Sequence, residues 1–160
     1  MILDALKLTG KNALVTGAQQ GLGAGIAVGL AEAGANVMVH GLEAAKAEAV
    51  RDTICKTGVQ SLTVVGDVCD AEFCAHMVES TVERLGSIDI LVNNAGIIRR
   101  APAAEYPLAD WSDVIETNLN SIFRLCQLAG RRIRHTSARP RCSRGNQLAD
   151  WSERSTSGGE

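Results

Sequence analysis

The stretch Asn12–Gly23, NALVTGAQQGLG, decides the fold of this 160-residue chain. Asn12–Val15 is a short apolar run that predicts a buried strand, and Gly21–Ala33 continues with apolar residues at helical spacing. A glycine turn between a strand and a helix lets backbone N–H groups approach a pyrophosphate, because the helix N-terminus carries partial positive charge. An ordinary tight turn without a ligand also fits these residues.

The spacing of this turn, T-G-x-x-x-G-x-G over residues 16–23, excludes two other phosphate-binding loops. A P-loop ends in Gly-Lys-Ser/Thr, and no lysine stands in the turn. The G-x-G-x-x-G fingerprint needs a third glycine where this chain has Ile26.

Downstream of the turn, strand and helix signals alternate along the chain. Further strands are predicted at Asn36–His40, Ser61–Val65 and Ile88–Val92, and further helices at Leu42–Lys56, Asp70–Leu85 and Ala109–Ala129. Strands separated by single helices imply right-handed βαβ units and a parallel sheet. Because the strands are this apolar, we expect helices on both faces of the sheet, an α/β fold that is doubly wound.

Polar residues stand where the predicted strands end. Gly66-Asp67-Val68 follows the third strand; its Asp can accept from an exocyclic amine or cap the next helix. Asn93-Asn94-Ala95-Gly96 follows the fourth strand and can tie strand ends together beside a flat ligand, or form an ordinary turn. Asn118 lies in the apolar stripe of the last helix, where structural bridging and a role in an active site are both open.

Composition and charge narrow the classes of function. The net charge of −2 argues against a nucleic-acid partner, and no apolar run approaches the ~20 residues of a membrane span. The opening eight residues are too short and too charged for a signal peptide. The five cysteines have no C-x-x-C spacing, so we expect free thiols and no metal site. A protein of the reducing cytoplasm is the expectation.

Four motifs together resemble the short-chain dehydrogenase/reductase family: the glycine turn at 16–23, Gly66-Asp67-Val68, NNAG at 93–96, and Asn118-Leu119. The resemblance covers about residues 7–130 and implies a Rossmann-like sheet that holds NAD or NADP across the carboxyl ends of its strands. Asn118 would belong to the catalytic group, and family members are commonly homo-oligomers. The implied cofactor-binding residues are Thr16, Gly17, Gln20, Gly21, Leu22, Gly23, Gly41, Asp67, Val68, Asn93, Asn94, Ala95 and Gly96.

The family's other catalytic residues are a serine and, about a dozen positions later, a Tyr-x-x-x-Lys pair that handles the proton at the carbinol oxygen. Ser143 stands at roughly the expected distance, but its setting, Arg-Cys-Ser-Arg-Gly, does not read as a buried strand end. The last lysine is Lys56 and the only tyrosine is Tyr106. We therefore predict a sheet that is incomplete after its fourth strand and following helix, and a chain without dehydrogenase turnover.

Charge divides the chain into two parts. Residues 1–130 carry nine basic and fifteen acidic residues, whereas residues 131–160 carry seven arginines and three acidic residues. We interpret 1–130 as the dinucleotide-binding part and 131–160 as an Arg/Ser-rich tail, either disordered or produced by a reading-frame shift.

Single residues and one short run of sequence indicate the cofactor and the substrate. In the family an acid at the end of the second strand selects NAD, and Gly41 stands at that place, with Glu43 two residues on. The nearest cation for the 2′-phosphate of NADP is Lys46, so we favour NAD. The run NNAGIIRR resembles members that act on sugar acids such as 2-deoxy-D-gluconate, with Arg99 and Arg100 near the substrate carboxylate or simply solvated. Enzymes of gluconate or 3-hydroxybutyrate, and a non-catalytic nucleotide-binding fragment, are the alternatives.

Overall fold

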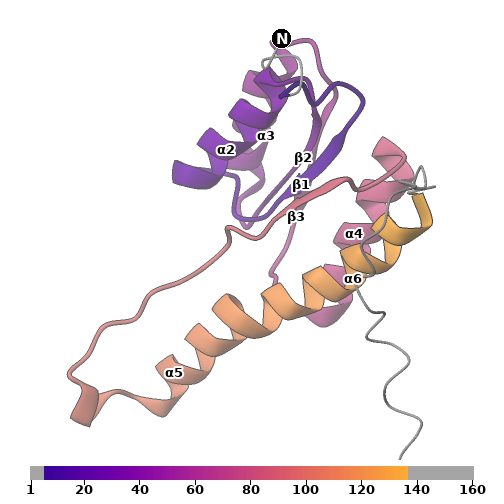
Figure 1. Ribbon diagram of the computed structural model, residues 1–160. Coiled ribbons are helices and arrows are strands. Elements are labelled where there is room, and N and C mark those ends of the chain that lie inside the picture. The colour runs from indigo at the N-terminus through magenta and orange to yellow at the C-terminus, as the bar shows by residue number, and fades with distance from the viewer. Residues whose placement is uncertain (1–5, 137–160) are drawn as a thin grey trace, which may run out of the picture.

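The computed structural model describes residues 6–136. Strands and helices alternate along the chain, as Figure 1 shows. Each of the first three strands is followed by one helix and then by the next strand. The elements are β1 (Asn12–Val15), α2 (Gly21–Glu32), β2 (Asn36–Gly41), α3 (Ala44–Cys55), β3 (Ser61–Val65), α4 (Ala71–Leu85), β4 (Ile90–Val92), the 3₁₀ turn η1 (Ala103–Glu105), α5 (Leu108–Ile115), the π-helical turn η2 (Glu116–Asn120) and α6 (Ser121–Thr136).

The four strands form one parallel sheet in the order β3-β2-β1-β4. The helices α2 and α3 lie on one side of the sheet, and α4 and α6 lie on the other (Figure 1). The predicted doubly wound, Rossmann-like α/β fold is therefore confirmed. The chain order reverses between β1 and β4, and the carboxyl ends of strands at such a switch point are where parallel sheets bind ligands.

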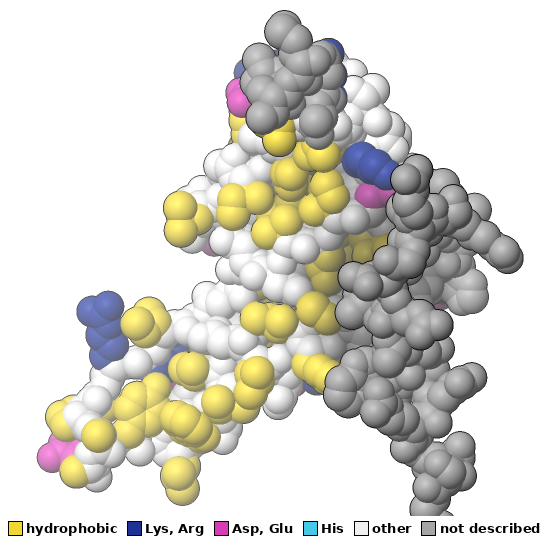
Figure 2. All heavy atoms as spheres, in the orientation of Figure 1, with side chains coloured by type: hydrophobic (Ala, Val, Ile, Leu, Met, Phe, Trp, Pro, Cys, Tyr) yellow, Lys and Arg dark blue, Asp and Glu magenta, His cyan; other side chains and the backbone are white. Residues whose placement is uncertain are grey.

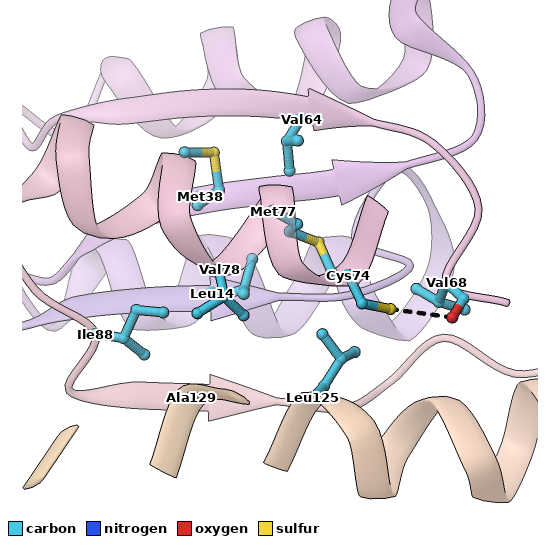
Figure 3. Packing of buried hydrophobic residues seen from close by; sticks show 10 residues of the cluster. All are labelled: Leu14, Met38, Val64, Val68, Cys74, Met77, Val78, Ile88, Leu125 and Ala129. Atoms are coloured by element: carbon cyan, nitrogen blue, oxygen red, sulfur yellow. Dashed lines mark hydrogen bonds between the residues drawn. The ribbon is translucent and has the colours of Figure 1, made fainter. Parts of the chain in front are cut away.

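Alternating side chains on the inner strands build two cores. Leu14 of β1 and Met38 of β2 are fully buried against α4 and α6, together with Met77 and Leu125 (Figure 3). Their neighbours on the same strands point the other way, where Ala13 and Val15 pack against Ala27 and other small residues of α2. The small side chains let α2 approach the sheet closely, which brings its N-terminus to the end of β1.

The element boundaries differ from the prediction at the fourth strand and at the last helix. The strand begins at Ile90 rather than at Ile88, because Ile88 is buried in the core beneath α4 and Asp89 accepts a hydrogen bond from the Asn12 N–H at 3.0 Å. The long helix predicted for Ala109–Ala129 is divided by η2 and continues to Thr136. Gly86, with φ at 95°, ends α4 as predicted.

Several predictions concern residues outside the described range. Ser143 and most of the predicted tail, 131–160, lie there, although residues 131–136 form the last turns of α6. Cys55, Cys69, Cys74 and Cys126 are free thiols. Within residues 6–136, no group of His, Cys, Asp and Glu is arranged to hold a metal ion, and no helix is long and apolar enough to cross a membrane.

Candidate functional site

A cleft of about 720 Å³ opens at the carboxyl ends of the strands. Figure 2 shows the molecule hollowed between the sheet with its helices and the projecting segment around α5. The lining contains every predicted cofactor-binding residue except Thr16 and Asn93. It consists of Gly17, Gln19–Gly23, Gly41, Leu42, Asp67–Cys69, Asn94–Ile97, Arg99, Asp113, Glu116 and Thr117.

The glycine turn needs glycine for two different reasons. Gly17 and Gly21 adopt φ values of 61° and 58°, a left-handed conformation that other residues rarely adopt. Gly23 instead allows close approach, since a Cβ there would stand 2.3 Å from the Gly17 carbonyl oxygen and 2.4 Å from Asn94 Nδ2. By contrast, a Cβ on Gly21 would meet nothing within 4 Å, so this glycine borders open space.

The N-terminus of α2 is not capped by the side chain of its own N-cap residue. Its N-cap residue, Gln20, makes no side-chain hydrogen bond to the first turn, and that turn contains no acidic residue. The N-terminus of α4 is different, because Asp70 accepts from the Glu72 and Phe73 N–H groups. The first N–H groups of α2 therefore remain available at the cleft, which suits a pyrophosphate.

Thr16 and Asn94 join the ends of β1 and β4. The buried Thr16 hydroxyl accepts hydrogen bonds from the N–H groups of Asn94 and Ala95, at 3.0 and 3.1 Å. Asn94 Nδ2 donates to the carbonyl oxygens of Thr16 and Gly17, at 3.0 and 3.1 Å. These contacts fix the glycine turn to the end of β4, so Thr16 supports the cleft from below rather than lining it.

Asn93 has a different environment from Asn94. Its Nδ2 donates to the Cys126 sulfur at 3.3 Å, while its buried Oδ1 has no hydrogen-bond partner among residues 6–136. Of the two asparagines, only Asn94 ties neighbouring strand ends together, which was the predicted structural role for the pair.

Asp67 and Val68 lie in the cleft wall after β3. One Asp67 carboxylate oxygen accepts from the Cys69 N–H at 2.9 Å and closes the local turn, whereas Asp70 caps the next helix. Arg124 of α6 donates to the carbonyl oxygens of Val68 and Cys69, at 3.3 and 3.4 Å. The loop that holds Asp67 is therefore held in place by α6.

Arg124 also binds Glu116 of η2, at 2.8 Å, and Glu116 accepts from Asn120 at 2.6 Å. The hydrogen bond from Arg124, followed by that from Asn120, lowers the pKa of Glu116. The same ion pair raises the pKa of Arg124. Glu116 is thus a carboxylate at neutral pH, and it connects the π-helical turn to the loop after β3.

Gln19 occupies the place beside Gly41. A Cβ on Gly41 would stand 2.3 Å from Gln19 Oε1 and 2.7 Å from Gln19 Cβ. Gln19 Oε1 accepts from the Glu43 N–H at 2.7 Å, and the Glu43 carboxylate pairs with Lys46 at 2.6 Å. Gly41 has no side chain, and the space beside it at the end of β2 is filled by the side-chain amide of Gln19 from the glycine turn.

His40, which the sequence did not single out, lies beneath the turn. Its Nδ1 is 3.1 Å from the Gly17 nitrogen, and its Nε2 is 2.9 Å from the Gly66 carbonyl oxygen. Burial lowers the pKa of His40, opposed by the hydrogen bond to Gly66 and by the charge of Asp67. The sequence signal for this position was a polar residue next to the end of an otherwise apolar strand.

Asn118 lies in η2 and holds the loop after β4. Its Oδ1 accepts from the Ile97 N–H and its Nδ2 donates to the Ile97 carbonyl, both at 2.8 Å. This geometry matches the structural bridging considered for Asn118, and the side chain does not line the cleft. Its catalytic role stays a prediction.

The two arginines proposed for the substrate are placed differently. Arg99 lines the cleft, with its Nε 3.9 Å from Asp110 of α5. Arg100 does not line it. Asp113, Glu116 and Thr117 complete the far wall, and their i, i+3, i+4 spacing in the sequence could have shown that they share one helix face.

The chain is similar in sequence to several enzymes that are named for different substrates. It is 41% identical over 133 residues to 2-dehydro-3-deoxy-D-gluconate 5-dehydrogenase of Dickeya dadantii, covering 83% of this chain and 52% of that enzyme. It is 39% identical to gluconate 5-dehydrogenase of Gluconobacter oxydans, over 81% and 51% of the two chains. It is 44% identical to a 3-oxoacyl-(acyl-carrier-protein) reductase of Staphylococcus aureus, over 78% and 50%. The chain thus spans about half the length of these relatives.

Solved structures give the same result. A putative short-chain alcohol dehydrogenase from Sinorhizobium meliloti superposes with a TM-score of 0.79 at 41% identity, over 82% of this chain and 52% of that one. A 7α-hydroxysteroid dehydrogenase complexed with NADH superposes with a TM-score of 0.78 at 37% identity, over 81% and 50%. The family model for short chain dehydrogenases matches residues 11–139. This chain belongs to the short-chain dehydrogenase family.

Proposed function

We propose that the cleft is the dinucleotide site of an NAD(P)-dependent oxidoreductase that acts on a hydroxyl or keto group. The observation that carries this proposal is the uncapped N-terminus of α2, which meets the cleft beside three glycines of the turn. Backbone N–H groups of residues 20–23 would hold the pyrophosphate. When bound, the nicotinamide would accept or supply the hydride.

The remaining residues of the cleft would orient the two ends of the dinucleotide. Asp67 and Val68, after β3, would hold the adenine, and Asn94–Gly96, after β4, would lie beside the nicotinamide end. Asn118 supports this second region, because it holds both backbone polar groups of Ile97. Without that bridge the loop after β4 would lose its fixed position over the cleft.

We propose NAD rather than NADP as the cofactor. Near Gly41 none of the lining residues of the described chain is cationic, and Lys46 stands outside the cleft and is already paired with Glu43 at 2.6 Å. A 2′-phosphate bound there would lack a cationic partner, which is costly for a dianion. We expect NADH to bind more tightly than NADPH, and a tenfold preference for NADPH would contradict this choice.

We propose a sugar acid such as 2-deoxy-D-gluconate as the substrate. Two of the relatives above are named for gluconate derivatives, and the run Asn93–Arg100 most resembles 2-deoxy-D-gluconate 3-dehydrogenase. Arg99, at the edge of the cleft, would face the carboxylate. Gluconate 5-dehydrogenase-like and 3-hydroxybutyrate dehydrogenase-like activities are the alternatives. We place this enzyme in the cytoplasm as a homo-oligomer by analogy with the family.

A polypeptide of these 160 residues would bind the cofactor without turning over substrate. The sequence contains no Tyr-x-x-x-Lys, and losing a general acid costs about 10²–10⁴-fold in rate. Reduction of NAD with 2-deoxygluconate at an ordinary rate of ~10 per second would contradict this proposal.

Binding is tested by fluorescence titration of the chain with NADH. Gly23→Ala should abolish binding or weaken it by at least ~tenfold, because the added methyl group overlaps the Gly17 carbonyl and Asn94. Gly25→Ala is the matched control, since a Cβ at Gly25 meets nothing within 4 Å in the same helix. A folded chain that binds neither NADH nor NADPH would overturn the proposed function.

A further inference from the structure

His40 is a titratable side chain buried beneath the cleft, with 2% of its surface exposed. It stands near the end of β2, between the glycine turn and the end of β3. The proposed dinucleotide site does not use it directly, because it does not line the cleft. A buried imidazole with a partner at each nitrogen nevertheless controls the backbone on both sides of it.

The two partners determine the tautomer of His40. The Gly17 N–H is a donor, so Nδ1 must be the acceptor that faces it at 3.1 Å. The Gly66 carbonyl is an acceptor, so Nε2 must carry the proton at 2.9 Å. Only the neutral imidazole protonated at Nε2 satisfies both contacts.

His40 holds the glycine turn at two points. Besides the Nδ1 contact to Gly17, its backbone carbonyl accepts from the Ala18 N–H at 2.7 Å. The first two N–H groups of the turn after Thr16 therefore point toward β2. The N–H groups that follow, at the start of α2, are then left to face the cleft.

We infer that His40 is a positioning residue of the dinucleotide site, whose neutral imidazole ties Gly17 to Gly66 and thereby sets the distance between the pyrophosphate turn and the loop that carries Asp67. The inference rests on the proposed function for its effect on NADH. The bridge itself is a property of the protein without ligand and is measured separately.

Protonation of His40 would break the bridge. A proton on Nδ1 would face the Gly17 N–H, placing two donors against each other. The charged group that acts on the imidazole is Asp67, from the loop after β3; the other neighbours are the uncharged backbone of Gly17 and Gly66 and the Phe73 ring of α4, with centroids 5.7 Å apart. NADH affinity should therefore fall as the pH is lowered.

Two substitutions separate the halves of the bridge. His40→Asn keeps an oxygen near the position of Nδ1 and so keeps an acceptor for the Gly17 N–H. His40→Gln places an NH₂ near the position of Nε2 and keeps the donor to Gly66. Because each of these variants keeps only one half of the bridge, at pH 7.5 we expect His40→Asn and His40→Gln each to bind NADH at least ~threefold more weakly than wild type, and His40→Ala at least ~tenfold more weakly.

The pH profile distinguishes positioning from general support of the fold. As the pH is lowered from 7.5 through the pKa of His40, which burial holds below its ordinary value, the NADH dissociation constant should rise at least ~threefold more in wild type than in His40→Asn, which lacks the titrating group. Thermal melts at each pH show whether every variant is folded during the titration. Equal affinity of folded wild type and His40→Ala, or identical pH profiles for wild type and His40→Asn, would overturn the inference.

The state of the imidazole is measured without cofactor by ¹⁵N NMR of the histidine rings. We expect His40 in the Nε2-protonated neutral form at pH 7, and a charged ring or the other tautomer would overturn the bridge. If the chain binds no NADH but shows this tautomer, the proposed function fails while the bridge stands. If it binds NADH but shows the other tautomer, the bridge fails alone.

Discussion

The sheet with its flanking helices and the arm, residues 97–120, are held in place by different means. Each face of the sheet has its own buried core, and the strand ends are linked by hydrogen bonds through Thr16, Asn94 and His40. In the arm, α5 buries no residue, and Leu108 and Trp111 are 82% and 57% exposed. Figure 2 shows hydrophobic side chains gathered over α5 and the adjoining part of α6.

This difference separates two kinds of functional residue. The residues proposed to hold the dinucleotide lie on a packed framework, so their geometry follows from the core. The residues proposed to face the substrate lie on the arm, whose polar contacts with the rest of the described chain are chiefly those of Glu116 with Arg124 and of Thr117 with Cys69. We therefore expect substitutions in the two regions to differ sharply in their effect on stability.

The largest expected effect is at the sheet. Leu14→Ala should lower the free energy of unfolding by about 3 kcal/mol. Leu14 of β1 is fully buried against α4, so truncating its side chain leaves a cavity. The matched control is Leu108→Ala in the arm, expected to change it by less than about 0.5 kcal/mol. Urea unfolding followed by circular dichroism measures both, and equal losses would remove the distinction between the regions.

A smaller effect is expected at the junction of β1 and β4. Thr16→Val keeps the shape of the side chain but leaves the Ala95 N–H without its acceptor and the Asn94 N–H with only the Val92 carbonyl, at 3.2 Å. We expect a loss of about 2 kcal/mol in the free energy of unfolding. Thr53→Val, on the exposed surface of α3, removes a hydroxyl that bonds only to the Ala49 carbonyl and should cost much less. A Thr16 variant as stable as the Thr53 variant would show that this junction is not held by the hydroxyl.

The smallest effect is expected in the arm. Trp111→Ala should cost less than about 1 kcal/mol, although a buried tryptophan typically costs about 3–5 kcal/mol when truncated. The test is urea unfolding of this variant beside Leu14→Ala. A loss at Trp111 as large as at Leu14 would mean that the arm is packed in solution against a surface outside residues 6–136.

Local sequence patterns predicted the sheet well and the junctions poorly. The strands Asn12–Val15 and Ser61–Val65 have the predicted limits, because short apolar runs bounded by glycine are strong signals. Gly17, Gly21 and Gly23 were predicted to cradle the pyrophosphate; all three line one cleft, and their role there stays a prediction. Spacing identifies such residues because a single turn contains them.

The bridges between distant segments could not be predicted in the same way. His40 and Gln19 act on residues from other turns, and nothing in their own neighbourhoods indicates those partners. The π-helical turn at Glu116–Asn120 interrupts an apolar pattern that continues through it, so the pattern alone predicted one helix. Thr16 and Asn93 were assigned to the cofactor by motif; neither lines the cleft, Thr16 is buried and Asn93 is half-buried.

The most direct test of the account is a map of backbone amide shifts on adding NADH to the chain, recorded by ¹H–¹⁵N NMR. We predict the largest shifts at residues 17, 19–23, 41, 67–69 and 94–97, which line the cleft, and small shifts at Leu108–Trp111 of the arm. Shifts confined to the arm, or none at any NADH concentration in a folded chain, would contradict the claim that these residues form a dinucleotide site.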